Sequence, residues 1–164
     1  MKRRGFILKT GCGTLGVLLS GTLIGCSNDS AISLKDLLGG GHEKFLDNKF
    51  PRIGGEKFSY YILKKGNFHH QNFNGEKVFI FCQKENIIGF TIQIKGNDAV
   101  NSVLDELDKT YSNKRKIFEN EFGTKYQWSA PNKNISLCFT KEYPELPEYT
   151  FYSEYLDGEN LIIF

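Results

Sequence analysis

The 164-residue chain has few of the residues and patterns on which catalysis and metal binding usually depend. Its three histidines are His42, His69 and His70, and their spacing does not resemble that of a zinc site. Adjacent histidines in an extended segment point to opposite sides, so we expect His69 and His70 to be solvated loop residues. No serine has the surroundings of a nucleophile elbow, and no glycine-rich phosphate loop follows an expected strand. We therefore expect no enzyme, no metal site and no cofactor.

The chain also lacks a long uninterrupted hydrophobic run and has no acidic residue before Asp29. A helix that spans a bilayer needs about 20 mainly apolar residues. The apolar stretch that ends at Ile24 is broken by glycines such as Gly16 and Gly21, so it is a poor permanent anchor. It is preceded by the cations Lys2, Arg3, Arg4 and Lys9. A cationic start, an apolar run and a small-residue end are typical of a secretory signal peptide, which we assign to residues 1–25.

The end of this segment, Leu23-Ile24-Gly25-Cys26, resembles the lipobox of bacterial prolipoproteins. The resemblance implies that the Cys26 thiol receives diacylglycerol, that the signal is cleaved before Cys26, and that the new amino terminus is acylated. Gly25 supplies the small residue that this cleavage needs. Two or three acyl chains hold a protein stably on a membrane, whereas one chain does not. An ordinary secretory peptide or an uncleaved membrane helix, with Cys26 incidental, is the alternative.

The first residues also resemble a twin-arginine export motif, with Arg3 and Arg4 followed by a short spacer and apolar residues. That resemblance implies export of an already folded protein. Lys2 stands where the motif usually has Ser or Thr, and paired arginines also occur in ordinary signals, so both export routes stay open. Ser27 replaces the aspartate of an inner-membrane retention signal, which favours the outer membrane in a cell that has two membranes.

Cleavage before Cys26 would remove four of the 21 Lys and Arg residues and none of the 19 Asp and Glu residues. The formal net charge of the remainder would be −2. We see no single-sign field in this remainder, which argues against a nucleic-acid partner. Residues 26–44 are mostly small and polar and include three consecutive glycines, which predicts a tether. A short helix in its apolar patch, residues 32–38, that docks back onto the domain is the alternative. Residues 45–164 are then expected to form a single domain.

Three strands are predicted in the first half of this domain, over residues 58–63, 77–83 and 87–94. The second is apolar on both faces and is expected to be central, whereas the third alternates and should bury one face. The segment 84–86 is short enough for a hairpin, so the last two strands should pair antiparallel.

Residues 98–111 predict an amphipathic helix, with apolar residues three, four, seven and eleven positions apart. Asn97 or Asp98 is expected to cap its start. A basic linker at 114–116 should follow, and then strands around 126–128, 135–139, 149–155 and 161–164. The predicted fold is α+β, an antiparallel sheet in the order β-β-β-α-β-β-β packed on one amphipathic helix.

Two side-chain predictions follow from the expected strands. Cys82 and Cys138 would remain after lipidation of Cys26, and an exported compartment permits a disulfide between them. Alternation places Cys82 on an apolar row and Cys138 on a polar row, so two separate packed thiols are the alternative. Aromatic residues on the strands could present a rigid contact surface, or could simply fill the core. Those singled out for a contact surface are Tyr60, Tyr126, Trp128 and Tyr152.

The leading functional hypothesis is a noncatalytic, lipid-anchored envelope protein that binds a protein or another envelope component. A module that binds a small ligand or the cell wall through an aromatic groove is the second hypothesis, and an enzyme is the third. In architecture alone the predicted domain resembles small lipid-anchored assembly factors and periplasmic inhibitor or immunity proteins.

Overall fold

The computed structural model describes residues 31–38, 43–71, 73–141 and 147–158. The predicted signal and lipidation residues (Arg3, Arg4, Leu23, Gly25 and Cys26), His42 and the predicted strand 161–164 lie outside these residues. Residues from Ala31 onward form one compact unit. None of the helices in the described ranges combines the length and the hydropathy that a bilayer-crossing helix needs.

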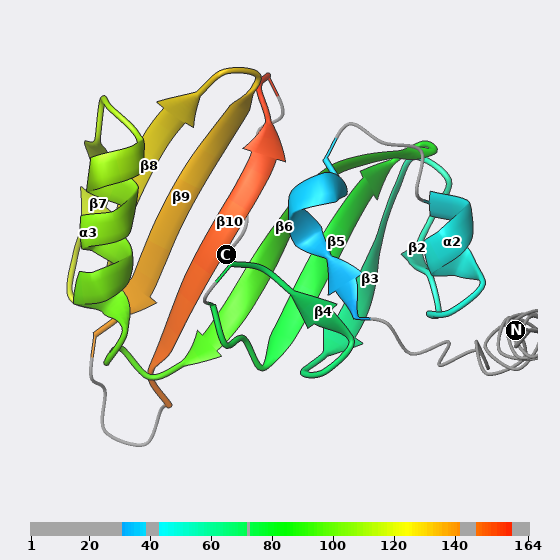
Figure 1. Cartoon of the computed structure of the whole chain (residues 1–164), viewed down its shortest axis with the longest axis horizontal. Coiled ribbons are helices and arrows are strands. Elements are labelled where there is room, and N and C mark those ends of the chain that lie inside the picture. Colours follow the sequence, from blue (N-terminus) through cyan, green and yellow to red (C-terminus); the bar gives the residue numbers. More distant parts are fainter. Residues whose placement is uncertain (1–30, 39–42, 72, 142–146, 159–164) are drawn as a thin grey trace, which may run out of the picture. The chain divides into compact units, whose positions relative to one another are not determined.

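One eight-stranded sheet dominates the fold, and each pair of neighbouring strands in it is antiparallel (Figure 1). Its strands, in spatial order, are β2 (Ile53–Gly54), β3 (Phe58–Lys64), β5 (Lys77–Gln83), β6 (Asn86–Lys95), β10 (Tyr149–Leu156), β9 (Lys133–Thr140), β8 (Gly123–Ala130) and β7 (Arg115–Glu119). A separate pair of short parallel strands consists of β1 (Ile32–Ser33) and β4 (Phe68–His69). The predicted antiparallel sheet is therefore confirmed, in a fold that is α+β or mainly β.

The predicted element order is incomplete. The strands expected over 58–63, 77–83 and 87–94 correspond to β3, β5 and β6, and β5 and β6 form the expected hairpin. The expectation that the third strand buries one face is wrong, because Gly89 and Thr91 of β6 are buried on the face opposite Phe90. The segment interpreted as a basic linker is instead largely strand β7, which charged residues conceal from a hydropathy pattern. Strand β10 lies in the middle of the sheet, between β6 and β9, so the last described strand joins the two halves of the fold.

The strand register divides the sheet into two faces, because directly opposite residues point the same way. One row across the sheet contains Tyr61, Ile80, Phe90, Glu154, Ile135 and Trp128, all almost fully buried. We call this side the helical face. The adjacent row contains Ile62, Phe79, Thr91, Ser153, Ser136, Gln127 and Arg115. We call that side the open face, since no described helix packs on it.

Two groups of elements cover the helical face (Figure 1). Helix α3 (Val100–Thr110) buries Val100, Val103 and Leu107, and the Trp128 indole Nε1 donates a hydrogen bond to Asp108 at 2.9 Å. The other group comprises β1, β4, the 3₁₀ turn η1 (Leu34–Asp36) and helix α2 (Glu43–Asp47). The α3 cap prediction is wrong, because Ala99 is the N-cap residue and makes no side-chain cap bond.

The asparagine expected to cap α3 has another role. The Asn97 Nδ2 donates to the Thr140 carbonyl at 2.7 Å, and its Oδ1 accepts from the Thr150 hydroxyl at 3.0 Å. These bonds tie the start of the helix to β9 and β10 rather than to its own first turn.

The predicted tether over residues 26–44 includes part of the core. Ile32, Leu34 and Leu37 are buried against the same cluster as the sheet residues. The expectation that the domain begins at residue 45 is therefore wrong, because the short apolar patch before the three glycines docks onto the sheet. Burying apolar side chains of this size stabilises a fold by roughly 1.5–3 kcal/mol each.

Candidate functional site

Strand β7 is the more accessible edge of the sheet. It pairs with β8 alone, and all five of its residues are exposed. The register shifts between Lys116 and Phe118, which marks a β-bulge. A bulge on an edge strand limits unselective pairing with other chains but leaves backbone groups available to a fitted partner. The opposite edge, β2, has only two residues.

Large hydrophobic side chains gather at this edge. Ile117, Phe118 and Phe122 expose 47%, 41% and 59% of their surface. We call strand β7 with Phe122 the edge patch. Isolated exposed hydrophobic residues are common, but three within six consecutive positions on an edge strand and its loop form a contact surface that a partner could bury. The patch is therefore the best-supported protein contact site in the described part of the chain.

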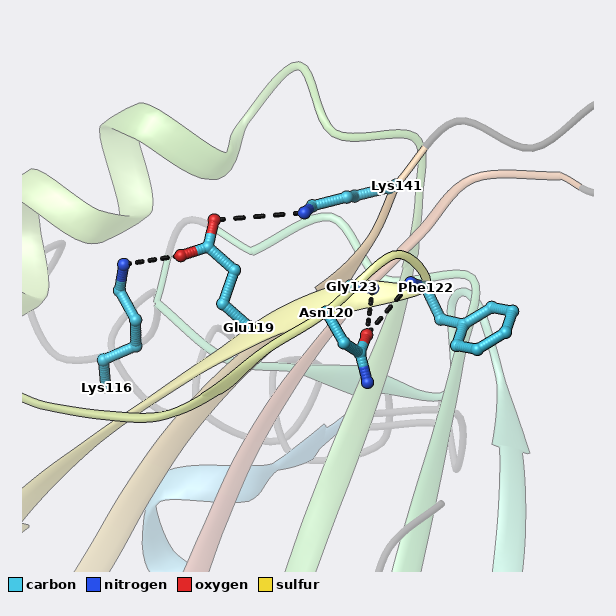
Figure 2. Close-up of polar contacts among 6 residues, drawn as sticks. All are labelled: Lys116, Glu119, Asn120, Phe122, Gly123 and Lys141. Atoms are coloured by element: carbon cyan, nitrogen blue, oxygen red, sulfur yellow. Dashed lines mark hydrogen bonds and ion pairs between the residues drawn. The ribbon is translucent and has the colours of Figure 1, made fainter.

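The loop after β7 holds Phe122 in place (Figure 2). The Asn120 side-chain oxygen accepts hydrogen bonds from the backbone N–H groups of Phe122 and Gly123, at 2.9 and 3.0 Å. A Cβ on Gly123 would lie 2.6 Å from the Phe139 carbonyl oxygen, so only glycine allows this close approach of β9. The loop is thus a defined turn that orients the aromatic ring.

Charged side chains accompany the patch on the helical face of β7. Figure 2 shows Glu119 between two lysines, with the Lys116 Nζ at 2.7 Å and the Lys141 Nζ at 3.9 Å, and the Phe122 ring pointing away from them. The hydrogen bond from Lys116 lowers the pKa of Glu119 below its ordinary value, and the same bond raises that of Lys116. These groups are exposed, so the contacts orient side chains and add little stability.

A buried polar cluster lies at the centre of the helical face. The Tyr152 hydroxyl donates to the Glu154 Oε1 at 2.6 Å, and the Lys133 ammonium pairs with Oε2. The His70 Nε2 lies 3.2 Å from Oε1, outside hydrogen-bonding geometry, and neither ring nitrogen has a hydrogen-bond partner among the described residues. His70 instead packs against the rings of Phe73, Tyr152 and a third aromatic residue on β6.

Electrostatics favour the ionised form of Glu154. Burial raises the pKa of this carboxyl, but its contacts with His70, Lys133 and Tyr152 outweigh that effect and bring the pKa to about 2. Burial and the neighbouring Glu154 charge both raise the pKa of Tyr152 above its ordinary value. The cluster therefore holds a charged carboxylate against a neutral phenol, an arrangement that joins β9, β10 and the segment after β4.

A surface hollow of about 620 Å³ lies beside β2. Arg52, Gly54, Gly55, Glu56, Lys84 and Glu85 line it. The Arg52 Nε donates to the Ser59 hydroxyl at 2.8 Å and its Nη2 to the Lys84 carbonyl at 3.0 Å. The lining carries both signs of charge and no aromatic side chain, so it differs from the aromatic groove expected of a ligand module.

The aromatic residues singled out from the sequence do not form one surface. Trp128 and Tyr152 are 0% and 1% exposed, so the prediction that they belong to a contact surface is wrong. Tyr126 is half-buried on the helical face, beneath the Lys114 ammonium at 4.6 Å from the ring centroid. Tyr60 is half-buried on the open face, near the Phe81 ring.

The cysteines and the paired histidines also separate. Cys82 is on the helical face of β5, Cys138 is on the open face of β9, and no disulfide joins them. The two thiols are separate, as the alternating rows of the strands favoured, and the possible disulfide between them is not formed. His69 is exposed as expected, but the prediction of a solvated His70 is wrong because this residue is 2% exposed. No group of three potential metal-ligating side chains occurs in the described ranges.

Sequence reasoning missed Lys133, Glu154, Ile117 and Phe118. Tyr152 and Glu154 are two positions apart on one strand, so their side chains point to the same face. The sequence could therefore have predicted that the Glu154 carboxylate accepts a hydrogen bond from the tyrosine. The signal for the edge patch, two apolar residues within a charged segment, is weaker.

Comparison with known proteins found no matching family model, no similar curated protein and no similar solved structure.

Proposed function

We propose that this chain is an exported, lipid-anchored envelope protein whose domain binds a protein partner without catalysis. The lipobox-like Leu23-Ile24-Gly25-Cys26 supports the anchor, and the twin-arginine-like start supports export. In a cell with two membranes we place the anchor in the outer membrane, since Ser27 replaces the usual retention aspartate. Lipid at Cys26 would hold the domain close to the bilayer while its edge patch faces other envelope proteins.

The edge patch is the observation that carries the binding proposal. Strand addition supplies affinity through backbone hydrogen bonds and specificity through the flanking side chains. Here β7 offers the backbone edge, and Ile117, Phe118 and Phe122 offer the apolar contacts. The occupant we propose is an extended segment of another protein, because an unpaired strand edge matches that shape.

Site-specific photo-crosslinking in intact cells tests this contact. A photoreactive residue in place of Phe118 should give a discrete adduct with one protein. Phe45, on α2, is the matched control, since it is exposed to 44% against 41% for Phe118. Substituting Ile117→Pro should remove the adduct at position 118, because proline cannot donate a backbone hydrogen bond. Identical adduct patterns at positions 45 and 118 would refute the edge as a contact site.

The anchor is tested separately through Cys26. Cys26→Ala should release the chain from membranes or leave an uncut precursor, because no thiol is present to accept the lipid. Mass spectrometry of the native chain should show an acylated cysteine as the first residue. Unchanged processing and membrane retention in the variant would refute lipidation while leaving the edge contact open to its own test.

A module for a small ligand or cell-wall fragment is the second candidate, and the hollow beside Arg52 is the observation that favours it. Its mixed charges suit a zwitterionic ligand such as an amino acid or a short peptide. Short peptides with free termini should then raise the melting temperature of the chain, and Arg52→Ala should abolish that shift. An inhibitor, an immunity protein or an enzyme is less well supported, because no described feature selects those classes.

A further inference from the structure

The two faces of the sheet differ sharply in charge. The eight strands contain two carboxylates, Glu119 and Glu154, and both lie on the helical face, where each pairs with a lysine. The strand cations without such a partner point to the open face. These open-face cations are Lys64, Lys77, Lys95, Lys125 and Arg115. None of them forms an ion pair with a described carboxylate, so this face does carry the single-sign field that the composition does not reveal.

The open-face cations are close enough to repel one another. Lys64 and Lys77 are directly opposite on β3 and β5, and Lys95 on β6 is diagonal to Lys77. Like charges that are directly opposite in a sheet are destabilising. Asp157 follows β10 at the other end of the sheet, where its Oδ1 accepts a hydrogen bond from the Asn134 side chain at 3.1 Å. No described carboxylate forms an ion pair with these three lysines, although Glu76 and Glu148 lie beside Lys77 and Tyr149 in the chain.

Aromatic and aliphatic side chains share this face with the cations. Phe58 stacks on Phe81 at 6.1 Å between ring centroids, and Tyr149 lies 6.1 Å from Phe151. Ile53, Tyr60, Ile62 and Phe79 lie on the same face by register. All of these residues are exposed or half-buried. Lysine together with tyrosine and phenylalanine is the composition that suits the headgroup region of a bilayer.

We propose that the open face docks flat on an anionic phospholipid surface, with the open-face cations on the phosphate groups and the aromatic rings at headgroup level. Neighbouring strands lie about 4.8 Å apart, so the five spacings from Lys64 on β3 to Lys125 on β8 span roughly 24 Å. A single small anion cannot contact both ends of such a row, whereas a lipid surface can. The inference rests on the proposed anchor only for bringing the domain to a membrane. It leaves the backbone edge of β7 at the side of the docked domain, whereas the Arg115 and Phe118 side chains of that strand belong to the docked face.

Lysine acetylation of the full chain in nanodiscs tests the docking. The chain is reconstituted in phosphatidylcholine alone or in an equimolar mixture with phosphatidylglycerol, and a water-soluble acetylating reagent is followed by mass spectrometry. One lysine at an anionic surface contributes roughly a fivefold effect on partitioning. We therefore expect the acetylation rate of each open-face lysine to be up to about fivefold lower in the anionic discs than in phosphatidylcholine discs. Exposed control lysines away from this face should react equally in both, namely Lys35, Lys44 and Lys109.

Two matched triple variants complete the test. The variant K64Q/K77Q/K95Q should remove the protection of Lys125 in anionic discs, whereas K35Q/K44Q/K109Q should leave it unchanged, with thermal melts showing that both fold. Equal reactivity of the open-face lysines in the two lipids would overturn the proposal. Protection by a soluble acidic polymer but not by anionic lipid would also overturn it and assign the face to such a polymer. If mass spectrometry shows that Cys26 of the native chain is unmodified and the open-face lysines are still protected by anionic lipid, the docking proposal is supported and only the anchor is refuted.

Discussion

The substitution Glu154→Gln removes one buried negative charge and keeps the shape of the side chain. In the folded chain this carboxylate accepts a hydrogen bond from Tyr152, pairs with Lys133 and faces His70. The glutamine amide can still accept the hydrogen bond from the Tyr152 hydroxyl, but it carries no charge to neutralise the Lys133 ammonium. The Glu154 side chain is 3% exposed, so water does not replace the lost interaction. We expect the variant to fold with reduced stability.

The pKa of Glu154 sets the size of the effect. Its value of about 2 lies below the ordinary 4.5, so the ionised form is favoured by folding. A difference of one pKa unit corresponds to about 1.4 kcal/mol, which gives roughly 3 kcal/mol in total. Because the folded pKa is the lower one, this contribution is complete above pH 4.5 and is lost as the pH falls toward 2.

Urea denaturation between pH 7 and pH 2 measures both predictions. At pH 7 the free energy of unfolding of the Glu154→Gln variant should be about 3 kcal/mol lower than that of the parent. As the pH falls below 4.5, the two curves should converge, because the parent then loses the same contribution. Glu119→Gln is the matched control, since that carboxylate is exposed and its removal should leave stability unchanged. Parallel curves for the Glu154 variant and the parent down to pH 2 would refute the reasoning.

Three further outcomes are expected. Trp128→Phe should lower the free energy of unfolding in urea by more than about 1 kcal/mol, the typical value of one lost hydrogen bond, because shortening the fully buried indole also leaves a cavity. A double-mutant cycle with Asp108→Asn isolates the hydrogen bond, and a coupling energy of zero would show that the bond adds no stability. Gly123→Ala should cost about 1–3 kcal/mol in urea denaturation, because its Cβ would clash with the Phe139 carbonyl; an unchanged midpoint would show that the hairpin relaxes. Burial raises the pKa of Cys138, so its alkylation should be slow at pH 7 and accelerate only in alkaline solution, and a rate already maximal at pH 7 would contradict this environment.

Much of the fold could be predicted because its strongest signals are local. Alternation in β6 and the helical spacing of Val100, Val103 and Leu107 need no knowledge of distant residues, and both elements appear where they are expected. Strand β7 could not be recognised in this way, since an edge strand needs no buried face and its residues read as a solvated linker. The same reason hides the edge patch, which becomes visible only when the strand has a neighbour.

The site residues show the same division. The burial of His70 and Glu154 depends on segments that are far apart in the chain meeting over β10, and no local pattern contains that contact. The alternation that separates Cys82 from Cys138 could be read from each strand, but whether the two rows face opposite sides depends on the pairing of the whole sheet.

The sequence alone determined the export-like start, the lipobox resemblance, the main strands and the amphipathic helix, because each depends on residues close together in the chain. Only the tertiary structure decided which residues of each strand lie on which face of the sheet, and which strand cations have no described carboxylate as a partner on their face. Acids and bases that are mixed along the chain were sorted onto two faces by strand register, and register is a property of pairing between distant segments.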